Sequence, residues 1–322
     1  MHFRQSTLMI RFTLQRLLQA LLVLLTVVSV VFMLERVTGN PAQLELPDYA
    51  SQAQRLALAK SYGLDAPLYV QYLRFLARAI TGDFGNSFNL QAEVGSGNGA
   101  SASVRDLIAH ALPYSAELAL TAFIFGSVVG VTLGTISAIY SGGWIDAVAR
   151  GISLLGQSVP SFWLGIMLVI LFAVKLHLLP AFGAGTTESL ILPAAALGAF
   201  PLAATTRLTR SATLDVLQAD HTLFERSKGV SQRVFLSHLL RNASLPVVTL
   251  SGIQLGQLLG GSVVIETLFA WPGIGQLAIQ AINNRDYAVI QGVVLVDSAI
   301  FVLLNLLVDI SYGWLDPRIS RQ

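Results

Sequence analysis

Hydrophobic residues in this chain are concentrated in long runs that are separated by polar segments. A membrane span needs about 20 mostly apolar residues, and it is helical because hydrocarbon offers no hydrogen-bond partner to an open backbone. Six runs qualify, at residues 13–34, 112–139, 152–174, 190–206, 246–269 and 288–310. The fourth is short and contains Pro193 and Pro201, each of which removes a backbone donor. The pattern predicts an all-α membrane protein with six transmembrane helices.

Two long polar segments interrupt the hydrophobic pattern. The segment 35–111 contains apolar residues at helical spacing, which predict an amphipathic helix, and then the glycine- and serine-rich residues 95–101, which predict a linker. Its amphipathic positions are Tyr69, Tyr72, Leu73, Leu76 and Ile80. The segment 207–245 has the pattern of two short helices separated by Gly229. The face of the first contains Leu214, Leu217 and His221, and the face of the second contains Val234, Phe235, His238 and Leu239. The apolar face of those two helices packs either beneath the protein's own helices or against a partner protein.

The basic residues predict how the chain is oriented. Lys and Arg that flank membrane spans are retained in the cytoplasm. With both termini inside, the short outer loops contain only Lys175 and Arg285. The inner segments contain Arg4, Arg11, Arg16, Arg150, Arg207, Arg210, Arg226, Lys228, Arg233, Arg241, Arg318 and Arg321. We therefore expect residues 1–12 in the cytoplasm, 13–34 as the first span, 35–111 outside, and 112–322 as a five-helix core whose loop 207–245 is cytoplasmic.

The composition agrees with a membrane protein and excludes several other classes. Hydrophobic residues make up 54% of the 322 positions and charged residues 12%, whereas soluble proteins are about 25% charged. Membrane lipid is thus the expected surrounding of the spans. The formal charge of +2 arises from 20 basic and 18 acidic residues without a basic stripe, so nucleic acid is not an expected partner. The chain has no cysteine, which excludes disulfides and thiolate chemistry.

Short strings that imitate catalytic motifs lack the neighbours that their chemistry needs. Residues 83–85 read DFG, but no glycine-rich nucleotide loop accompanies them. None of Lys60, Lys175 and Lys228 directly follows a glycine, so a phosphate-binding P-loop is missing. The five histidines include no pair at i, i+4. We therefore expect no catalytic residues, no metal site and no cofactor.

Ionisable residues within the predicted spans are candidate functional groups, because charge is costly in lipid. They are Glu117, Glu266, Asp297 and Asp309. Glu117 and Asp309 lie near span ends, where both can reach water. Asp297 lies deeper and either lines an aqueous path or makes a hydrogen bond between helices.

Taken in order, many short segments resemble the permease subunits of bacterial oligopeptide, dipeptide and nickel ABC importers. The resemblance covers nearly the whole chain. It rests on residues 62–72 (YGLDAPLYVQY), 82–87 (GDFGNS), 159–165 (VPSFWLG), 179–183 (LPAFG), 266–275 (ETLFAWPGIG), 285–287 (RDY) and 315–318 (LDPR). In the segment 207–245 it rests on Lys228-Gly229, on residues 238–243 (HLLRNA) and on Leu245-Pro246.

The resemblance implies a fold, a mechanism and partners. The fold would be the type I ABC-importer transmembrane fold in a bacterial inner membrane. The loop would couple the chain to an ATPase through Glu225, Lys228, Gly229, His238, Arg241 and Asn242. Expected partners are a second homologous permease, one or two ATP-binding subunits and an extracytoplasmic substrate-binding protein.

The resemblance leaves the cargo and one sequence detail open. Peptides are the expected cargo; a nickel chelate, glutathione or an opine-like solute is the alternative, and a stand-alone channel or secondary transporter is a distant one. The family usually has small residues where this chain has Phe224 and Glu225, so the fine geometry of the coupling loop is expected to differ.

Overall fold

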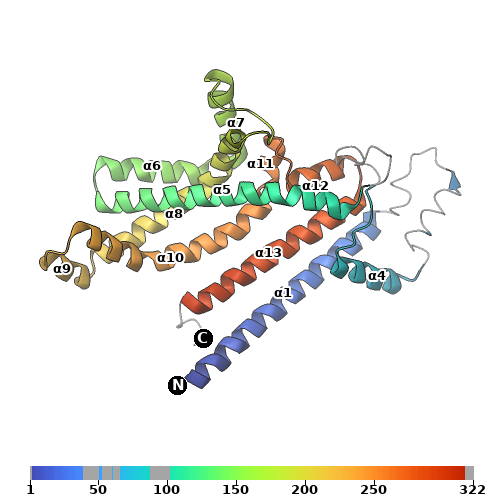
Figure 1. Cartoon of the computed structure of the whole chain (residues 1–322), viewed down its shortest axis with the longest axis horizontal. Helices are drawn as coiled ribbons and strands as arrows, with labels where there is room; N and C mark the ends of the chain where they lie inside the picture. Colours follow the sequence, from blue (N-terminus) through green and yellow to red (C-terminus); the bar gives the residue numbers. More distant parts are fainter. Residues whose placement is uncertain (1, 39–50, 53–59, 61–65, 88–101, 316–322) are drawn as a thin grey trace. The chain divides into compact units, whose positions relative to one another are not determined.

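The computed structural model describes residues 2–38, 51, 52, 60, 66–87 and 102–315. The expected linker at 95–101 and most of the motif at 315–318 lie outside them. The described chain is helical almost throughout (Figure 1), which confirms the all-α prediction. The helices are α1 (His2–Thr38), α4 (Leu68–Thr81), α5 (Val104–Ile139), α6 (Trp144–Ser158), α7 (Ser161–Leu168), α8 (Ile191–Leu217), α9 (Asp220–Ser227), α10 (Gln232–Gly261), α11 (Val263–Leu268), α12 (Ile274–Asn283) and α13 (Tyr287–Leu315). A π-helical segment, Val169–Lys175, continues α7, and a 3₁₀ turn, Thr187–Leu190, precedes α8.

Four stretches of the described chain are long and apolar enough to cross a membrane. They are Thr13–Leu34, Val104–Ile139, Thr187–Leu217 and Tyr287–Val308. A fifth exists only if α6 and α7, with its π-helical continuation, are counted as one span, although they meet at 111°. Helix α10, which contains most of the fifth expected span, is not among these described stretches. The structure thus gives four or five candidate spans.

The expectation of a single helix over 152–174 is wrong. Helix α6 ends at Ser158, and α7 begins at Ser161. Between them, Val159 is extended (φ −88°, ψ 125°) and Pro160 follows at φ −60°. A proline cannot donate to the preceding turn, and it disfavours helical geometry in the residue before it. Pro160 therefore accounts for the break.

The chain divides into two compact units. The first comprises Met1–Ser115 and Pro272–Leu306, and the second comprises Ala116–Trp271 and Leu307–Gln322.

In the first unit, the amphipathic helix predicted around Tyr69–Ile80 is confirmed as α4, which packs on α1. The Tyr72 hydroxyl lies 2.8 Å from Ser29 Oγ of α1. The Tyr72 ring meets the Phe32 ring of α1 edge-on, with 5.3 Å between centroids, and the Phe75 ring lies 5.7 Å from the Phe32 ring. Gly82 ends α4 in the left-handed region at φ 71°. The hydrophobic face of α4 is thus anchored by aromatic contacts.

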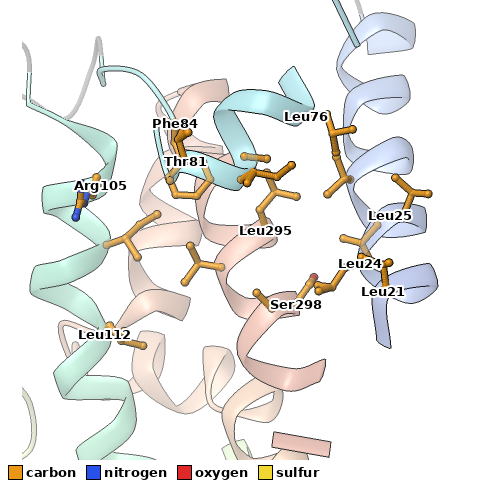
Figure 2. A pocket seen from close by; sticks show the side chains of 18 of the residues that line it. Leu21, Leu24, Leu25, Leu76, Thr81, Phe84, Arg105, Leu112, Leu295 and Ser298 are labelled. Atoms are coloured by element: carbon orange, nitrogen blue, oxygen red, sulfur yellow. The ribbon is translucent and has the colours of Figure 1, made fainter. Parts of the chain in front are cut away.

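A cavity of about 620 Å³ lies within the first unit, among α1, α4, α5 and α13 (Figure 2). Its lining is almost entirely aliphatic, with Leu21, Leu25, Leu76 and Leu295 from three of the helices. Arg105, Thr81 and Ser298 are the polar side chains of this lining. A lining of this kind offers few groups that could recognise a polar solute.

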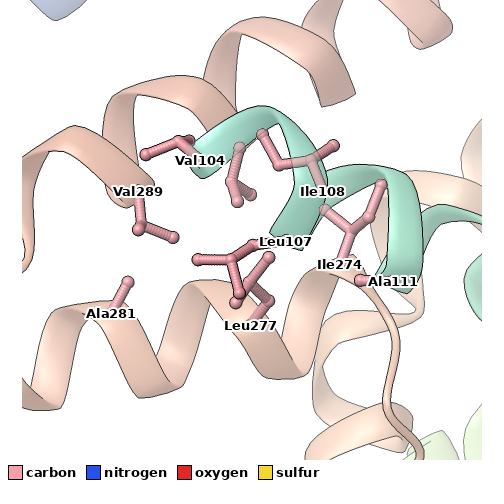
Figure 3. Close-up of a cluster of buried hydrophobic side chains, with 9 residues drawn as sticks. Val104, Leu107, Ile108, Ala111, Ile274, Leu277, Ala281 and Val289 are labelled. Atoms are coloured by element: carbon pink, nitrogen blue, oxygen red, sulfur yellow. The ribbon is translucent and has the colours of Figure 1, made fainter. Parts of the chain in front are cut away.

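A hydrophobic core in the first unit joins the start of α5 to α12 and α13 (Figure 3). It consists of Val104, Leu107, Ile108 and Ala111 from α5, Ile274, Leu277 and Ala281 from α12, and Val289 and Val293 from α13. Helix α5 begins at Val104 rather than at residue 112, so its first two turns belong to this core. Asp286 caps α13 by accepting a hydrogen bond from the Val289 amide (3.2 Å), and Ser87 Oγ donates to the same carboxylate (2.6 Å).

Helix α8 forms the centre of the second unit, where it contacts α6, α7 and α10. In its most apolar stretch 67% of the residues are buried, against 6% in that of α1. The helix is continuous through Pro201 and extends to Leu217, beyond the end expected at residue 206. Thr205 on α8 donates to the amide oxygen of the buried Gln254 on α10 (3.2 Å). This contact explains how a polar amide is accommodated within α10.

Candidate functional site

The predicted turn at Gly229 is present. Helix α9 ends at Ser227, α10 begins at Gln232, and Gly229 between them has φ +69°. Positive φ is the region that glycine enters without a Cβ penalty. No atom lies within 4 Å of the position that a Cβ would take on Gly229, which is exposed. The constraint at this residue is therefore conformational and does not come from packing.

The second predicted short helix is not a separate element. It forms the first turns of α10, which continues without a break for 30 residues. Leu214 and Leu217, expected on the first short helix, lie instead at the end of α8. The segment 207–245 is thus the end of α8, the short α9, the Gly229 turn and the first half of α10. We call residues 220–245 the α9–α10 hairpin.

Two of the predicted coupling residues hold the hairpin together. His238 Nδ1 on α10 lies 3.0 Å from Glu225 Oε1 on α9. The Glu225 side chain is 28% exposed and that of His238 is 49% exposed. A contact as open as this contributes at most about 1 kcal/mol to stability. Its role is to orient α9 on α10 more than to stabilise the fold.

The unusual residues of the hairpin also find partners within it. Phe224 and Glu225 occupy positions where the resembled family usually has small side chains. Glu225 contacts His238, and Lys228 Nζ lies 4.3 Å from the centroid of the Phe224 ring. A cation over an aromatic face is attracted to it. The larger side chains therefore add contacts that reinforce the turn.

The outer surface of the hairpin is basic and partly apolar. Lys228, Arg241 and Asn242 are all exposed. The side chains of Phe224, Val234 and Leu236 are also exposed, at 59%, 44% and 39%. Large apolar side chains that are exposed on a polar segment are available for contact with a partner protein.

The junction between α8 and α9 is fixed by a buried threonine. Thr222 is 3% exposed, and its Oγ1 donates to the carbonyl oxygen of Val216 at 2.6 Å. The Thr222 amide also donates to the Ala219 carbonyl (3.0 Å). These two hydrogen bonds fix the start of α9 to the end of α8, in addition to the covalent connection.

Asp297, predicted as a possible pathway residue, lies half-buried on α13 in the first unit. The cavity of that unit is lined by its neighbours Val296 and Ser298, and Asp297 is not among the described lining residues. Asp297 belongs to the first unit and the α9–α10 hairpin to the second.

Two features of the second unit were missed at the level of sequence. The first is Asp146, a buried carboxylate that accepts hydrogen bonds from Ser137 and Arg210. The second is a row of glycines on α5 at four-residue spacing, Gly126, Gly130 and Gly134, which pack against α8. The small-xxx-small spacing of these glycines is a recognisable signal of close helix packing in membranes. Nothing in the sequence marks Asp146, because its partners lie 9 and 64 residues away.

Comparison with known protein families covers nearly the whole chain. Residues 130–321 match the binding-protein-dependent transport system inner membrane component family, and residues 9–119 match the N-terminal region of the same kind of component. This chain belongs to that family. It is a permease component of an ABC importer, a transport subunit of the inner membrane that works with an ATPase.

Individual relatives agree with this assignment. The chain is 38% identical to the dipeptide transport system permease protein DppB of Alkalihalophilus pseudofirmus, over 97% of this chain and 100% of that protein. It is also 38% identical to the glutathione transport system permease protein GsiC of Salmonella paratyphi A and of Escherichia coli strain K12, over 97% of this chain and 99% of each relative.

Solved structures resemble this permease in fold. Inward-facing conformations of the MetNI methionine ABC transporter match at a TM-score of 0.53 with 19% identity, over 67% of this chain and 95% of the matched chain. A second crystal form of the same transporter gives 0.52 with 20% identity. The fold of this permease is therefore that of an ABC transporter's transmembrane subunit.

Proposed function

We propose that this permease forms half of the translocation pathway of a peptide importer and receives the ATPase movement through the α9–α10 hairpin. The exposed turn at Gly229 supports this role most directly. The turn joins α9 to the first turns of α10, with Phe224 exposed on α9, Lys228 exposed in the turn, and Val234 and Arg241 exposed on α10. Lys228, Arg241 and Asn242 would contact the ATPase, whereas Glu225 and His238 would hold the shape of the hairpin.

The proposed assembly contains a second homologous permease, one or two ATP-binding subunits and an extracytoplasmic substrate-binding protein. The exposure of α1 supports a partner or lipid on that helix, because its most apolar stretch is only 6% buried. The chain would adopt the type I importer arrangement with six spans and both termini in the cytoplasm. The second half of α10, with α11, would then supply the fifth span, and the bent α6–α7 pair the third.

The proposed cargo is a small peptide. The relatives with the same 38% identity are named for dipeptides and for glutathione, which is itself a small peptide. A nickel chelate or an opine-like solute has no comparable support. Uptake of a radiolabelled dipeptide and of radiolabelled glutathione by cells with and without this gene would separate the two peptide classes. If deletion left the uptake of both unchanged, the proposed cargo would be wrong.

The coupling role is tested by replacing Gly229 in the reconstituted importer. Gly229→Val forces a β-branched residue to positive φ, which costs on the order of 1–3 kcal/mol. We expect transport and substrate-stimulated ATP hydrolysis to be lost, while the loaded binding protein still binds. Gly229→Asn should retain most activity, because asparagine tolerates this conformation better.

Gly82→Val provides the matched control for this test. Gly82 also has positive φ (+71°) and has no atom within 4 Å of its Cβ position, but it ends α4. The same backbone strain at Gly82 should leave the number of substrates transported per ATP unchanged. Normal coupling in Gly229→Val would overturn the proposed role of the hairpin.

A further inference from the structure

The carboxylate of Asp146 joins three segments of the second unit. Asp146 lies in the first turn of α6 and is 1% exposed. It accepts hydrogen bonds from Ser137 Oγ near the end of α5 (2.6 Å) and from the Gly142 amide in the α5–α6 turn (3.0 Å). The Arg210 guanidinium on α8 donates through both Nε (2.6 Å) and Nη2 (3.0 Å). Arg150 Nε lies farther away, at 3.6 Å, on a side chain that is 60% exposed.

An ion pair of this kind is not explained by stability alone. Desolvating two charges is costly, and well-packed apolar residues often stabilise a fold equally well. A two-point contact between a guanidinium and a carboxylate does, however, fix direction as well as distance. The geometry of this pair is therefore suited to holding α6 and α8 at one mutual orientation.

Arg210 lies close to the α9–α10 hairpin along the chain. Arg210 lies about two turns before the end of α8 at Leu217, and α9 begins at Asp220. Thr222 ties α9 back to the Val216 carbonyl. On the other side, a Cβ on Gly134 of α5 would lie 2.6 Å from the Thr206 carbonyl oxygen and 3.1 Å from the Arg210 amide nitrogen. Helices α5 and α8 are thus already in tight contact beside the ion pair.

We infer that Asp146 and Arg210 are positioning residues that make the end of α5, the start of α6 and α8 move as one body with α9. A displacement of α9 by the ATPase would then reach three helices together instead of bending α8 alone. This inference rests on the proposed function of the hairpin, and its test has a readout that does not depend on transport.

The first measurement is a distance between spin labels in the reconstituted importer. This chain has no cysteine, so Ala147→Cys on α6 and Asp215→Cys on α8, both exposed, are its only labelling sites when the partner subunits are cysteine-free. In the otherwise unchanged chain, the distance should be the same in the nucleotide-free and ATP-bound states. With Asp146→Asn added, it should broaden or shift between the two states. A distance that changes with nucleotide while the ion pair is intact would overturn the inference.

The second measurement is the number of substrates transported per ATP hydrolysed, which does not depend on how much importer assembles. Asp146→Asn and Arg210→Gln should each lower this ratio by roughly fivefold, and the double variant should lower it no further. Arg210→Lys keeps the positive charge but loses the two-point contact of the guanidinium, so it should give an intermediate ratio. It replaces Asp146→Asn as the test if that variant does not assemble. Arg150→Gln is the matched control, because it removes an exposed positive charge that lies 3.6 Å from the same carboxylate. Its ratio should stay within about twofold of normal.

The outcomes separate the two levels of the proposal. A normal ratio in Asp146→Asn together with a lost ratio in Gly229→Val would overturn only the positioning role. A normal ratio in Gly229→Val would overturn the coupling role of the hairpin itself, whatever the label distances show.

Discussion

At the scale of single residues, the absence of side chains on α5 is as important as the side chains that are present. A Cβ on Gly126 would lie 2.9 Å from Pro201 Cβ, and one on Gly130 would lie 2.8 Å from Thr205 Cβ. At Gly134 the nearest atom would be the Thr206 carbonyl oxygen, at 2.6 Å. Apolar burial gives little net attraction between helices in lipid, so close backbone contact of this kind contributes much of their association.

This packing predicts that Gly134→Ala destabilises the permease. Alanine favours a helix interior over glycine by up to about 1 kcal/mol, but overpacking against a backbone carbonyl costs about 1–3 kcal/mol. We therefore expect a lower thermal unfolding midpoint for the detergent-solubilised protein. Gly151→Ala on α6 is the control: it has no atom within 4 Å of its Cβ position, and its midpoint should be unchanged or higher. Equal midpoints for the two variants would contradict the packing argument.

Residue-level prediction from the sequence succeeded where the conformation is local. Gly229 separates two helical patterns, and its positive φ follows from the turn that it has to make. The ion pair between Asp146 and Arg210 could not be predicted in this way, because it depends on how α6 and α8 pack. Arg210 contributed only to the charge count that predicts orientation.

At the scale of elements, the hydrophobic pattern predicted which segments are helical better than it predicted where a helix breaks or continues. Of the six expected spans, only 13–34 has the same bounds as a candidate span of the described chain, and the span at 152–174 is broken at Pro160. The reverse error occurred at α10, where the polar residues before Pro246 suggested a separate short helix. The structure continues α10 through Pro246, because the helix is held by packing against α8 more than by its own hydrophobic periodicity.

The packing of α4 on α1 gives a prediction at this scale. Phe32 is 3% exposed on α1 and contacts both Tyr72 and Phe75 of α4. Phe32→Ala should weaken this contact by about 3–5 kcal/mol, and hydrogen exchange along α4 should accelerate accordingly. Tyr72→Phe removes only the contact with Ser29 and should cost about 0.5–1.5 kcal/mol.

Met33→Ala is the control for Phe32→Ala, since the neighbouring Met33 side chain on the same helix is 62% exposed. Exchange along α4 should be unaffected in that variant. If Phe32→Ala also left the exchange rates unchanged, α4 would be held by contacts other than these aromatic ones.

At the scale of the whole molecule, the sequence predicted the class of protein more fully than its path through the membrane. The ordered motifs identified an importer permease, and the family match over residues 9–119 and 130–321 confirms it. The count of six spans depended on treating every apolar run as one straight crossing. Bent helices and buried amides such as Gln254 break the correspondence between one apolar run and one straight crossing, because their polar groups are satisfied inside the protein.

The orientation of the chain is predicted by its basic residues and can be tested with single cysteines. Tyr69 on α4 is 69% exposed, and Ser227 at the end of α9 is also exposed. The sparse Lys and Arg of the short outer loops predict that α4 lies outside the cytoplasm and α9 inside it. A membrane-impermeant maleimide should therefore label Tyr69→Cys in intact spheroplasts, and it should label Ser227→Cys only after the membrane is permeabilised. The unsubstituted chain is the control, since it has no cysteine to react. Labelling of Ser227→Cys in intact spheroplasts would contradict the predicted orientation. It would show that the α9–α10 hairpin lies outside the cytoplasm, where no cytoplasmic ATPase could contact it.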